Sequence, residues 1–303
     1  TKDPTHQRRT KGIVGTKVLF KEDTPFKSKK EQFLGNVENK QNFINLLAER
    51  FKSQNIVSHH AESDADVLIV QTAVESAKST TTVLIGEDTD LLVLLCYHMN
   101  SCHHNIIFQS EMKQSTKKFK VWDLKKTKKL LGEEFCKVLP FVHAISGCDT
   151  TSRLFGIGKG QAVKKAQTDV YFMECAHTFT DTMSKEEVLR IGEEVIVCLY
   201  NGVEHEGLDL LRFRKFTSKV MTSSKFVEVH TLPPTSNAAQ FHILRAFYQM
   251  KVWIGEDVNL NVKDWGWLID GNMYLPVRSS LPPAPEELLK TIYCRCKCNC
   301  DTK

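Results

Sequence analysis

The run TTVLIG (residues 81–86) constrains the fold more than any other stretch, because it is short, continuous and rich in β-branched residues. Such a run is typical of a buried strand in a parallel sheet. Apolar residues at helical spacing precede it, in residues 39–53 and again in residues 64–79. Helices and strands that follow one another in this order favour an α/β sheet.

The rest of the chain extends this pattern without an internal repeat. Apolar runs at residues 105–109 and 119–124 predict two more strands. Helical spacing covers residues 125–147, apart from Pro140, as well as residues 185–221 and 237–255, and residues 264–277 predict a small hairpin. We divide the chain into a basic, partly flexible N-terminal segment (1–38), a core (39–230), a C-terminal extension (231–293) and a Cys-rich tail (294–303), and expect both ends to be truncated.

Composition excludes several classes of protein. Of the 303 residues, 41% are apolar and 25% are charged, which argues against disorder over the whole length. No apolar run approaches the roughly 20 residues of a membrane helix, so we expect no membrane association. The cysteines upstream of residue 294 are scattered among apolar or helical surroundings, which is typical of reduced thiols inside a cell.

Lysine is concentrated in two places, although the net charge is only +5. Residues 113–129 hold eight Lys against one acid, and the first fifty residues hold eleven Lys or Arg against six acids. Such clusters suit nucleic acid, because neutralised phosphates release their counterions. A solvated lysine face that only keeps the protein dispersed explains either cluster equally well.

Carboxylates gather at two points that an α/β sheet brings together. Glu62 and Asp64 lie at the start of the second predicted helix, and Asp88 and Asp90 follow the TTVLIG strand. Ligands bind outside the carboxyl ends of strands in open α/β sheets. Clustered carboxylates repel one another unless a cation lies between them, and two Mg²⁺ or Mn²⁺ ions about 4 Å apart would support phosphodiester hydrolysis.

Each pair of acids also has a simpler explanation. Acids before a helix are favoured by its unpaired N–H groups, and acids after a strand are common in turns. Two further acids, Asp66 and Glu87, are not assigned by the sequence, since they either support the ligands or face solvent.

The glycine turn GIGKG (residues 156–160) predicts an anion site at the start of a short helix. It is neither a dinucleotide fingerprint, because residue 161 is Gln, nor a Walker loop, because Gly160 replaces Ser or Thr. The neighbouring Lys159, Lys164 and Lys165 indicate a nucleic-acid phosphate as the anion. A plain loop with helix-capping glycines is the alternative.

The order ESDAD, GEDTD and SGCDTTSRLFGIGKGQA resembles the flap-endonuclease/XPG-type structure-specific nucleases of the PIN-like superfamily. More loosely, the C-terminal part resembles an animal group of mobile-element-associated proteins. The resemblance covers residues 55–170 and implies a PIN-like parallel sheet flanked by helices, a helix-hairpin-helix DNA-binding turn and a small α+β extension. It implies metal-binding, catalytic roles for Glu62, Asp64, Asp88, Asp90 and Asp149.

The same resemblance implies that Gly156, Gly158 and Gly160 grip duplex DNA backbone, with a bound monovalent cation. Without the resemblance, Asp149 would be interpreted as the N-cap of a helix over residues 150–153. The family takes further metal-site aspartates from its first strands, and neither Asp3 nor Asp23 lies in a matching motif. The metal site of this chain is therefore expected to be incomplete.

The tail CRCKCNC places cysteine at every second position. On an extended strand these four residues span roughly 20 Å, too far for one tetrahedral zinc with ligands near 2.3 Å. A Zn²⁺ site there requires a turn or further cysteines after Lys303. The four are Cys294, Cys296, Cys298 and Cys300.

These observations predict an intracellular, nuclear nuclease that depends on a divalent metal and acts on branched or flapped DNA. Two alternatives stay open. The first is a catalytically inactive PIN-like module that only binds DNA. The second is a PIN-type ribonuclease, less favoured because simpler members of that class lack the glycine hairpin. The sequence does not indicate a protein partner.

Overall fold

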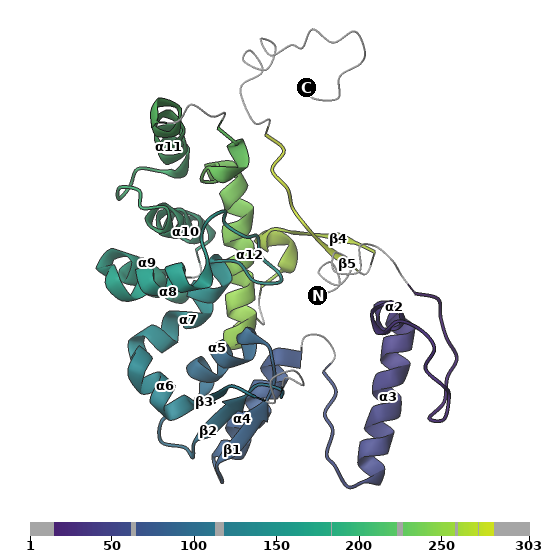
Figure 1. Cartoon of the computed structure of the whole chain (residues 1–303). Helices are drawn as coiled ribbons and strands as arrows, with labels where there is room; N and C mark the ends of the chain where they lie inside the picture. Colours follow the sequence, from purple (N-terminus) through teal and green to yellow (C-terminus); the bar gives the residue numbers. More distant parts are fainter. Residues whose placement is uncertain are drawn as a thin grey trace, which may run out of the picture.

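The computed structural model describes residues 15–61, 65–112, 118–182, 184–222, 227–257, 260–271 and 273–281. This part of the chain is mostly helical, with one small mixed sheet and a separate two-stranded hairpin (Figure 1). The mixed α/β class is therefore confirmed. The Cys-rich tail and its expected zinc site lie outside the described residues.

The helices are α2 (Lys30–Gly35), α3 (Val37–Ser53), α4 (Ala65–Ala77), α5 (Thr89–His98), α6 (Leu124–Leu131), α7 (Glu133–Ile145), α8 (Lys159–Thr168), α9 (Val170–Asp181), α10 (Lys185–Leu199), α11 (Leu208–Thr222) and α12 (Ser236–Ile254). Short 3₁₀ helices are η1 (Val229–Thr231) and η2 (Val262–Trp265). The strands are β1 (Thr82–Ile85), β2 (Ile106–Gln109), β3 (Val121–Asp123), β4 (Trp267–Asp270) and β5 (Met273–Pro276).

The first sheet has the order β1-β2-β3 and is not fully parallel. β1 pairs with β2 in parallel, as expected, but β2 pairs with β3 antiparallel. The prediction of a parallel sheet was wrong for β3. Residues 110–120, which join β2 to β3, are fewer than the dozen or more that a parallel crossover needs.

β1 lies at the edge of this sheet and is buried on one face only. Leu84 is 6% exposed, whereas Val83 and Ile85 are 55% and 64% exposed. The expectation of a fully buried strand was therefore wrong, although position and pairing direction were right. A continuous apolar run does not show whether both faces of its strand are covered.

A glycine, rather than a proline, divides the helical stretch after β3. Gly132 has φ = 87° and separates α6 from α7. The predicted interruption at Pro140 is wrong, because α7 runs through this residue. Proline removes one backbone N–H donor, yet here it lies within a run of buried residues, 138–145, that holds the helix in the core.

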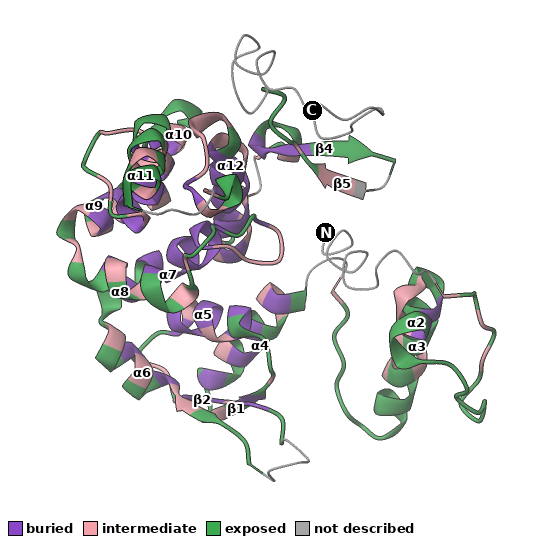
Figure 2. Ribbon diagram, turned by 45° about the horizontal axis from the view of Figure 1, so that its top comes forward, coloured by how far each residue is buried: buried purple, intermediate pink, exposed green. Residues whose placement is uncertain are grey.

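The centre of the molecule is built around α7 and α12. α12 packs on α7 and α10, and the buried surface concentrates on these helices (Figure 2). Phe247 of α12 stacks on Trp265 with ring centroids 4.5 Å apart and meets the edge of Phe179 at 5.5 Å. A helix from the predicted C-terminal extension therefore supplies part of the core.

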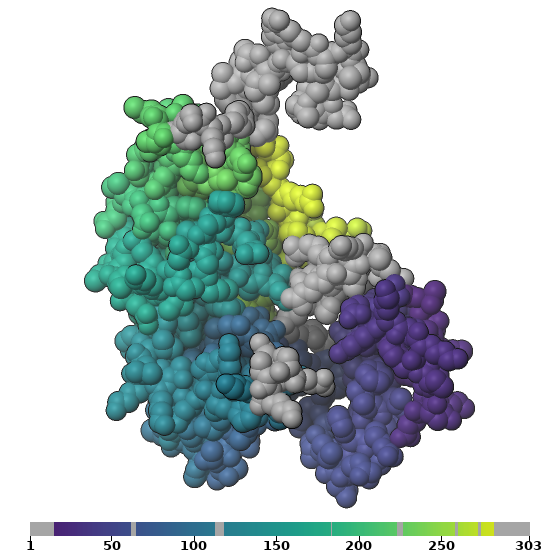
Figure 3. Space-filling view, viewed as in Figure 1, coloured from purple at the N-terminus to yellow at the C-terminus, as the bar shows by residue number. Residues whose placement is uncertain are grey.

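The N-terminal pair α2 and α3 stands beside the rest of the described chain (Figures 1 and 3). Phe33 is buried by ring contacts with Phe20, Phe26 and Phe43. The helical prediction for residues 39–53 is confirmed by α3. Most of its apolar residues nevertheless remain partly or fully exposed.

None of the helices in the described part combines the length and the apolar character that a membrane span requires.

Candidate metal centre and adjoining pocket

Three carboxylates converge on one point beside the first sheet. Asp66 offers one oxygen from the first turn of α4, and Asp88 and Asp90 offer theirs from the start of α5. The three oxygens lie within 4.8 Å of one another. Asp66 and Asp90 are buried, whereas Asp88 is exposed, so the group sits where the interior meets the surface.

Local helix geometry explains how two of these acids come together. Asp88 is the N-cap of α5, and its Oδ1 accepts a hydrogen bond of 3.0 Å from the backbone N of Asp90. Asp88 therefore has a structural role, but as a helix cap rather than as the turn residue considered above. The cap also fixes Asp88 next to Asp90, so capping and ligand placement are compatible. The apolar residues that follow form the buried body of α5.

Asp66 is the member of the group that the sequence did not assign. It belongs to the same face of α4 as the buried residues Val70, Ala73 and Ala77, at helical spacings of four, three and four. A carboxylate at the end of a buried stripe points toward the interior rather than toward solvent. That stripe was the signal in the sequence that could have identified Asp66.

Three other acids have different positions. Glu62 and Asp64 lie outside the described residues, so the structure does not place them. Glu87 does not join the group: its Oε1 accepts a hydrogen bond of 2.7 Å from the backbone N of Glu111, after β2. This hydrogen bond links the segment after β1 to the segment after β2 at the surface.

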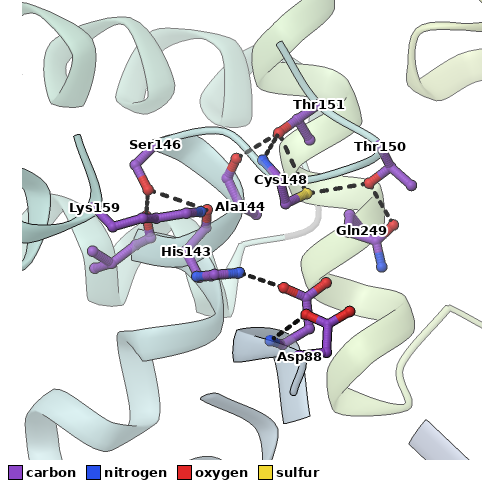
Figure 4. A network of polar contacts seen from close by, with 11 residues as sticks. Asp88, His143, Ala144, Ser146, Cys148, Thr150, Thr151, Lys159 and Gln249 are labelled. Atoms are coloured by element: carbon purple, nitrogen blue, oxygen red, sulfur yellow. Dashed lines mark hydrogen bonds and ion pairs between the residues drawn. The ribbon is translucent and has the colours of Figure 1, made fainter. Parts of the chain in front are cut away.

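A buried histidine contacts the acidic group from α7. The Nε2 of His143 donates to Oδ1 of Asp90 over 2.7 Å, and both side chains are largely buried (Figure 4). Sequence reasoning missed His143, although a single imidazole within the apolar run PFVHAI was the available signal.

A pocket of about 320 Å³ opens beside Asp88 and Asp90. Both acidic and cationic side chains line it. Asp149 lines the pocket, but it is not a member of the three-carboxylate group. The lining residues include Asp88, Asp90, His143, Asp149, Arg153, Gly158 and Lys159.

The loop that carries Asp149 is held by three buried polar residues of α12. His242, Arg245 and Gln249 recur at positions i, i+3 and i+7, and so share one face of the helix. Nε2 of His242 donates to the carbonyl of Ile145 (2.8 Å), and the backbone N of Ser152 donates to its Nδ1 (3.2 Å).

Arg245 and Gln249 complete the attachment of this loop. Arg245 Nη2 donates to Ser152 Oγ at 3.0 Å. The hydroxyl of Thr150 donates to Gln249 Oε1 at 2.7 Å, as Figure 4 shows. Burial lowers the pKa of His242 to about 4 and that of Arg245 to about 10. The sequence analysis predicted α12 only as a helix, yet its buried polar residues hold the loop that forms this wall of the pocket.

Residues 150–153 form no helix, so Asp149 is not the helix cap considered above.

The glycine turn leaves open space at its surface. Gly156 has φ = 74°, which favours glycine, and no atom lies within 4 Å of a Cβ added at Gly156, Gly158 or Gly160. Packing within the described chain therefore does not require glycine at the last two positions. An external group can approach the backbone closely here.

The three predicted lysines differ in their surroundings. Lys159 Nζ donates to the carbonyl of His143 (Figure 4), and burial lowers the pKa of Lys159 to about 8 despite the opposing charges of Cys148 and Asp90. Lys164 is exposed, and Lys165 forms an ion pair of 2.8 Å with Asp169. Lys159 alone of these three lines the pocket with the acids.

Comparisons of the chain with protein-family models, with curated proteins and with solved structures found no match.

Proposed function

We propose that this protein is a divalent-metal-dependent nuclease that hydrolyses phosphodiester bonds in branched or flapped DNA. The observation that carries the proposal is the convergence of Asp66, Asp88 and Asp90. Two of these acids line a pocket that also carries cationic side chains. A phosphodiester presents its anionic oxygens to both kinds of group at once.

The donor set fits a hard cation. The three converging ligand atoms are all carboxylate oxygens, which suit Mg²⁺ or Mn²⁺ better than metals that prefer nitrogen or sulfur. Two buried carboxylates in such a group repel each other unless positive charge lies nearby. When bound, the ion would activate water and stabilise the leaving oxygen.

The chain's own cations would hold the substrate. Lys159 and the exposed Arg153 line the same pocket as Asp88 and Asp90. With a pKa of about 8, Lys159 is mostly charged at neutral pH and can pair with a phosphate. The open backbone at Gly158 and Gly160 supports a role in contacting the sugar-phosphate backbone of a duplex.

The test is cleavage of a labelled flapped DNA in Mg²⁺ or Mn²⁺ by the wild type and by Asp66→Asn, Asp88→Asn and Asp90→Asn. We expect each variant to lose at least about a hundredfold in rate, because the ion is no longer held, while DNA binding persists. Asp264→Asn, an exposed acid, serves as the matched control. Wild-type cleavage by both the Asp88 and the Asp90 variants would refute the assignment.

Binding of the substrate is tested separately with Lys159→Gln. We expect weaker affinity for flapped DNA, whereas the distant, exposed Lys78→Gln should bind like the wild type. Running the same assay with RNA of matched sequence distinguishes a DNA enzyme from a PIN-type ribonuclease, since tighter binding and faster cleavage of RNA would favour the latter.

One observation favours a second function, a PIN-like module that binds DNA without cutting it. Among the described residues, Asp149 does not join the group, and the three carboxylates found there suit one ion better than the two ions of the usual phosphodiester mechanism. Under this alternative no divalent metal produces cut strands, while Lys159→Gln still weakens DNA binding.

A further inference from the structure

Resting on the proposed metal site, we propose that His143 is a positioning residue, whose ring holds the Asp90 carboxylate in the orientation that binds the ion. The role is assigned from the short contact between Nε2 and Oδ1 and from the way the surrounding structure fixes the imidazole.

The contact is strong because of its chemistry and its surroundings. A ring N–H that donates to a carboxylate over 2.7 Å makes a charge-assisted hydrogen bond. The His143 side chain is 6% exposed and that of Asp90 is 12% exposed, so water competes little for either group. Rotation of the Asp90 carboxylate would break this bond where both groups are largely shielded from water.

The imidazole and the backbone that carries it each have a further contact. Its ring packs beside the Trp253 ring, with centroids 5.5 Å apart, and the Lys159 ammonium holds the carbonyl of the same residue. The contacts come from α12 and from the first residue of α8. A donor whose ring packs against Trp253 and whose backbone is held by Lys159 can orient a ligand before the ion arrives, which is the usual function of groups that hydrogen-bond to metal ligands.

Such a role differs from that of an ordinary buried histidine. His98 on α5 is also partly buried, and its Nε2 hydrogen-bonds to the carbonyl of Trp253 at 2.8 Å. The partner of His98 is thus a backbone carbonyl, and His98 is not a member of the carboxylate group found among the described residues. Loss of either imidazole should therefore affect stability, but only loss of His143 should affect the metal.

The experiment compares two substitutions of His143 by amide side chains of different length. In His143→Gln the terminal NH₂ lies near the position of Nε2 and can still donate to Asp90. In His143→Asn the side chain is one methylene shorter, so its NH₂ does not reach Asp90. We expect Mn²⁺ affinity, measured by electron paramagnetic resonance of free Mn²⁺ without nucleic acid, to fall about tenfold or more in His143→Asn. It should stay within about threefold of wild type in His143→Gln.

Unfolding free energies measured in EDTA show whether the two variants fold equally well, and His98→Gln is the control that should bind Mn²⁺ like the wild type. Wild-type affinity in His143→Asn, or equal loss in both variants at equal stability, would overturn the positioning role. Unchanged affinity in Asp90→Asn would instead refute the metal site itself, and this role with it.

Discussion

Helices α3 and α12 both carry regular apolar residues, but the structure surrounds them very differently. On α12, Phe247 is fully buried, and even the polar residues His242 and Arg245 are at most 5% exposed. Helix α3 is largely exposed (Figure 2), and its Phe43 and Phe51 are 37% and 42% exposed. Helical periodicity therefore predicts a helix and its apolar face, but it does not show what covers that face.

The largest effect predicted by this comparison belongs to Phe247→Ala. The ring is fully buried and stacks on Trp265, so truncation leaves a cavity and removes an aromatic contact. We expect the free energy of unfolding in urea to fall by about 3–5 kcal/mol. A loss below about 1 kcal/mol would mean that α12 is not the central helix.

A second effect comes from the pH dependence of His242. Burial lowers the pKa of its imidazole from 6.5 to about 4, so the unfolded chain binds a proton that the folded chain resists. Its contribution is complete above pH 6.5 and is lost as the pH falls toward 4, by about 3 kcal/mol in total.

His242→Gln should remove this extra pH dependence, which we would measure as the difference between urea-unfolding curves of variant and wild type from pH 7 to pH 4. Carboxylates that titrate in the same range affect both proteins and cancel in the difference. A constant difference over this range would show that His242 is not buried as a neutral ring.

A smaller effect on stability is expected where α12 holds the loop that carries Asp149. Thr150→Val keeps the shape of the side chain but removes its 2.7 Å hydrogen bond to Gln249. We expect a loss of about 1–2 kcal/mol, because Gln249 is buried and its oxygen loses a partner. Adding Gln249→Leu should cost less in the background of the Thr150→Val variant than alone, and strict additivity in this double-mutant cycle would contradict the contact.

The parts of the fold that the sequence predicted well are those with local causes. The strands β1, β2 and β3 and the helices α3, α4 and α12 follow from periodicity and β-branched runs. The antiparallel direction of β3 and the exposed face of β1 depend on neighbours that local pattern does not specify.

The candidate site shows the same division. Asp88 and Asp90 were identified because acids at the carboxyl end of a predicted strand leave a local signature, although the helix α5 that follows them was not predicted. Asp66 and His143 were missed because each joins the group only through packing of α4 and α7 against α5. The resemblance to flap-endonuclease-type nucleases predicted a metal-binding role for Asp149. In the structure Asp149 lines the pocket but does not join the three carboxylates.

The smallest predicted effect tests the exposed side of the comparison. Phe51→Ser replaces an apolar residue on α3 that lies partly in solvent, so we expect a change in unfolding free energy of no more than about 0.5 kcal/mol. Phe33→Ser is the matched variant in the same helical pair, and it should destabilise that pair because its ring is buried among other aromatic rings. If Phe51→Ser instead lowered stability by about 2 kcal/mol or more, the outer face of α3 would be covered in solution. Sedimentation at several protein concentrations would then show whether a second copy of the chain provides the cover, because its contribution must grow with concentration.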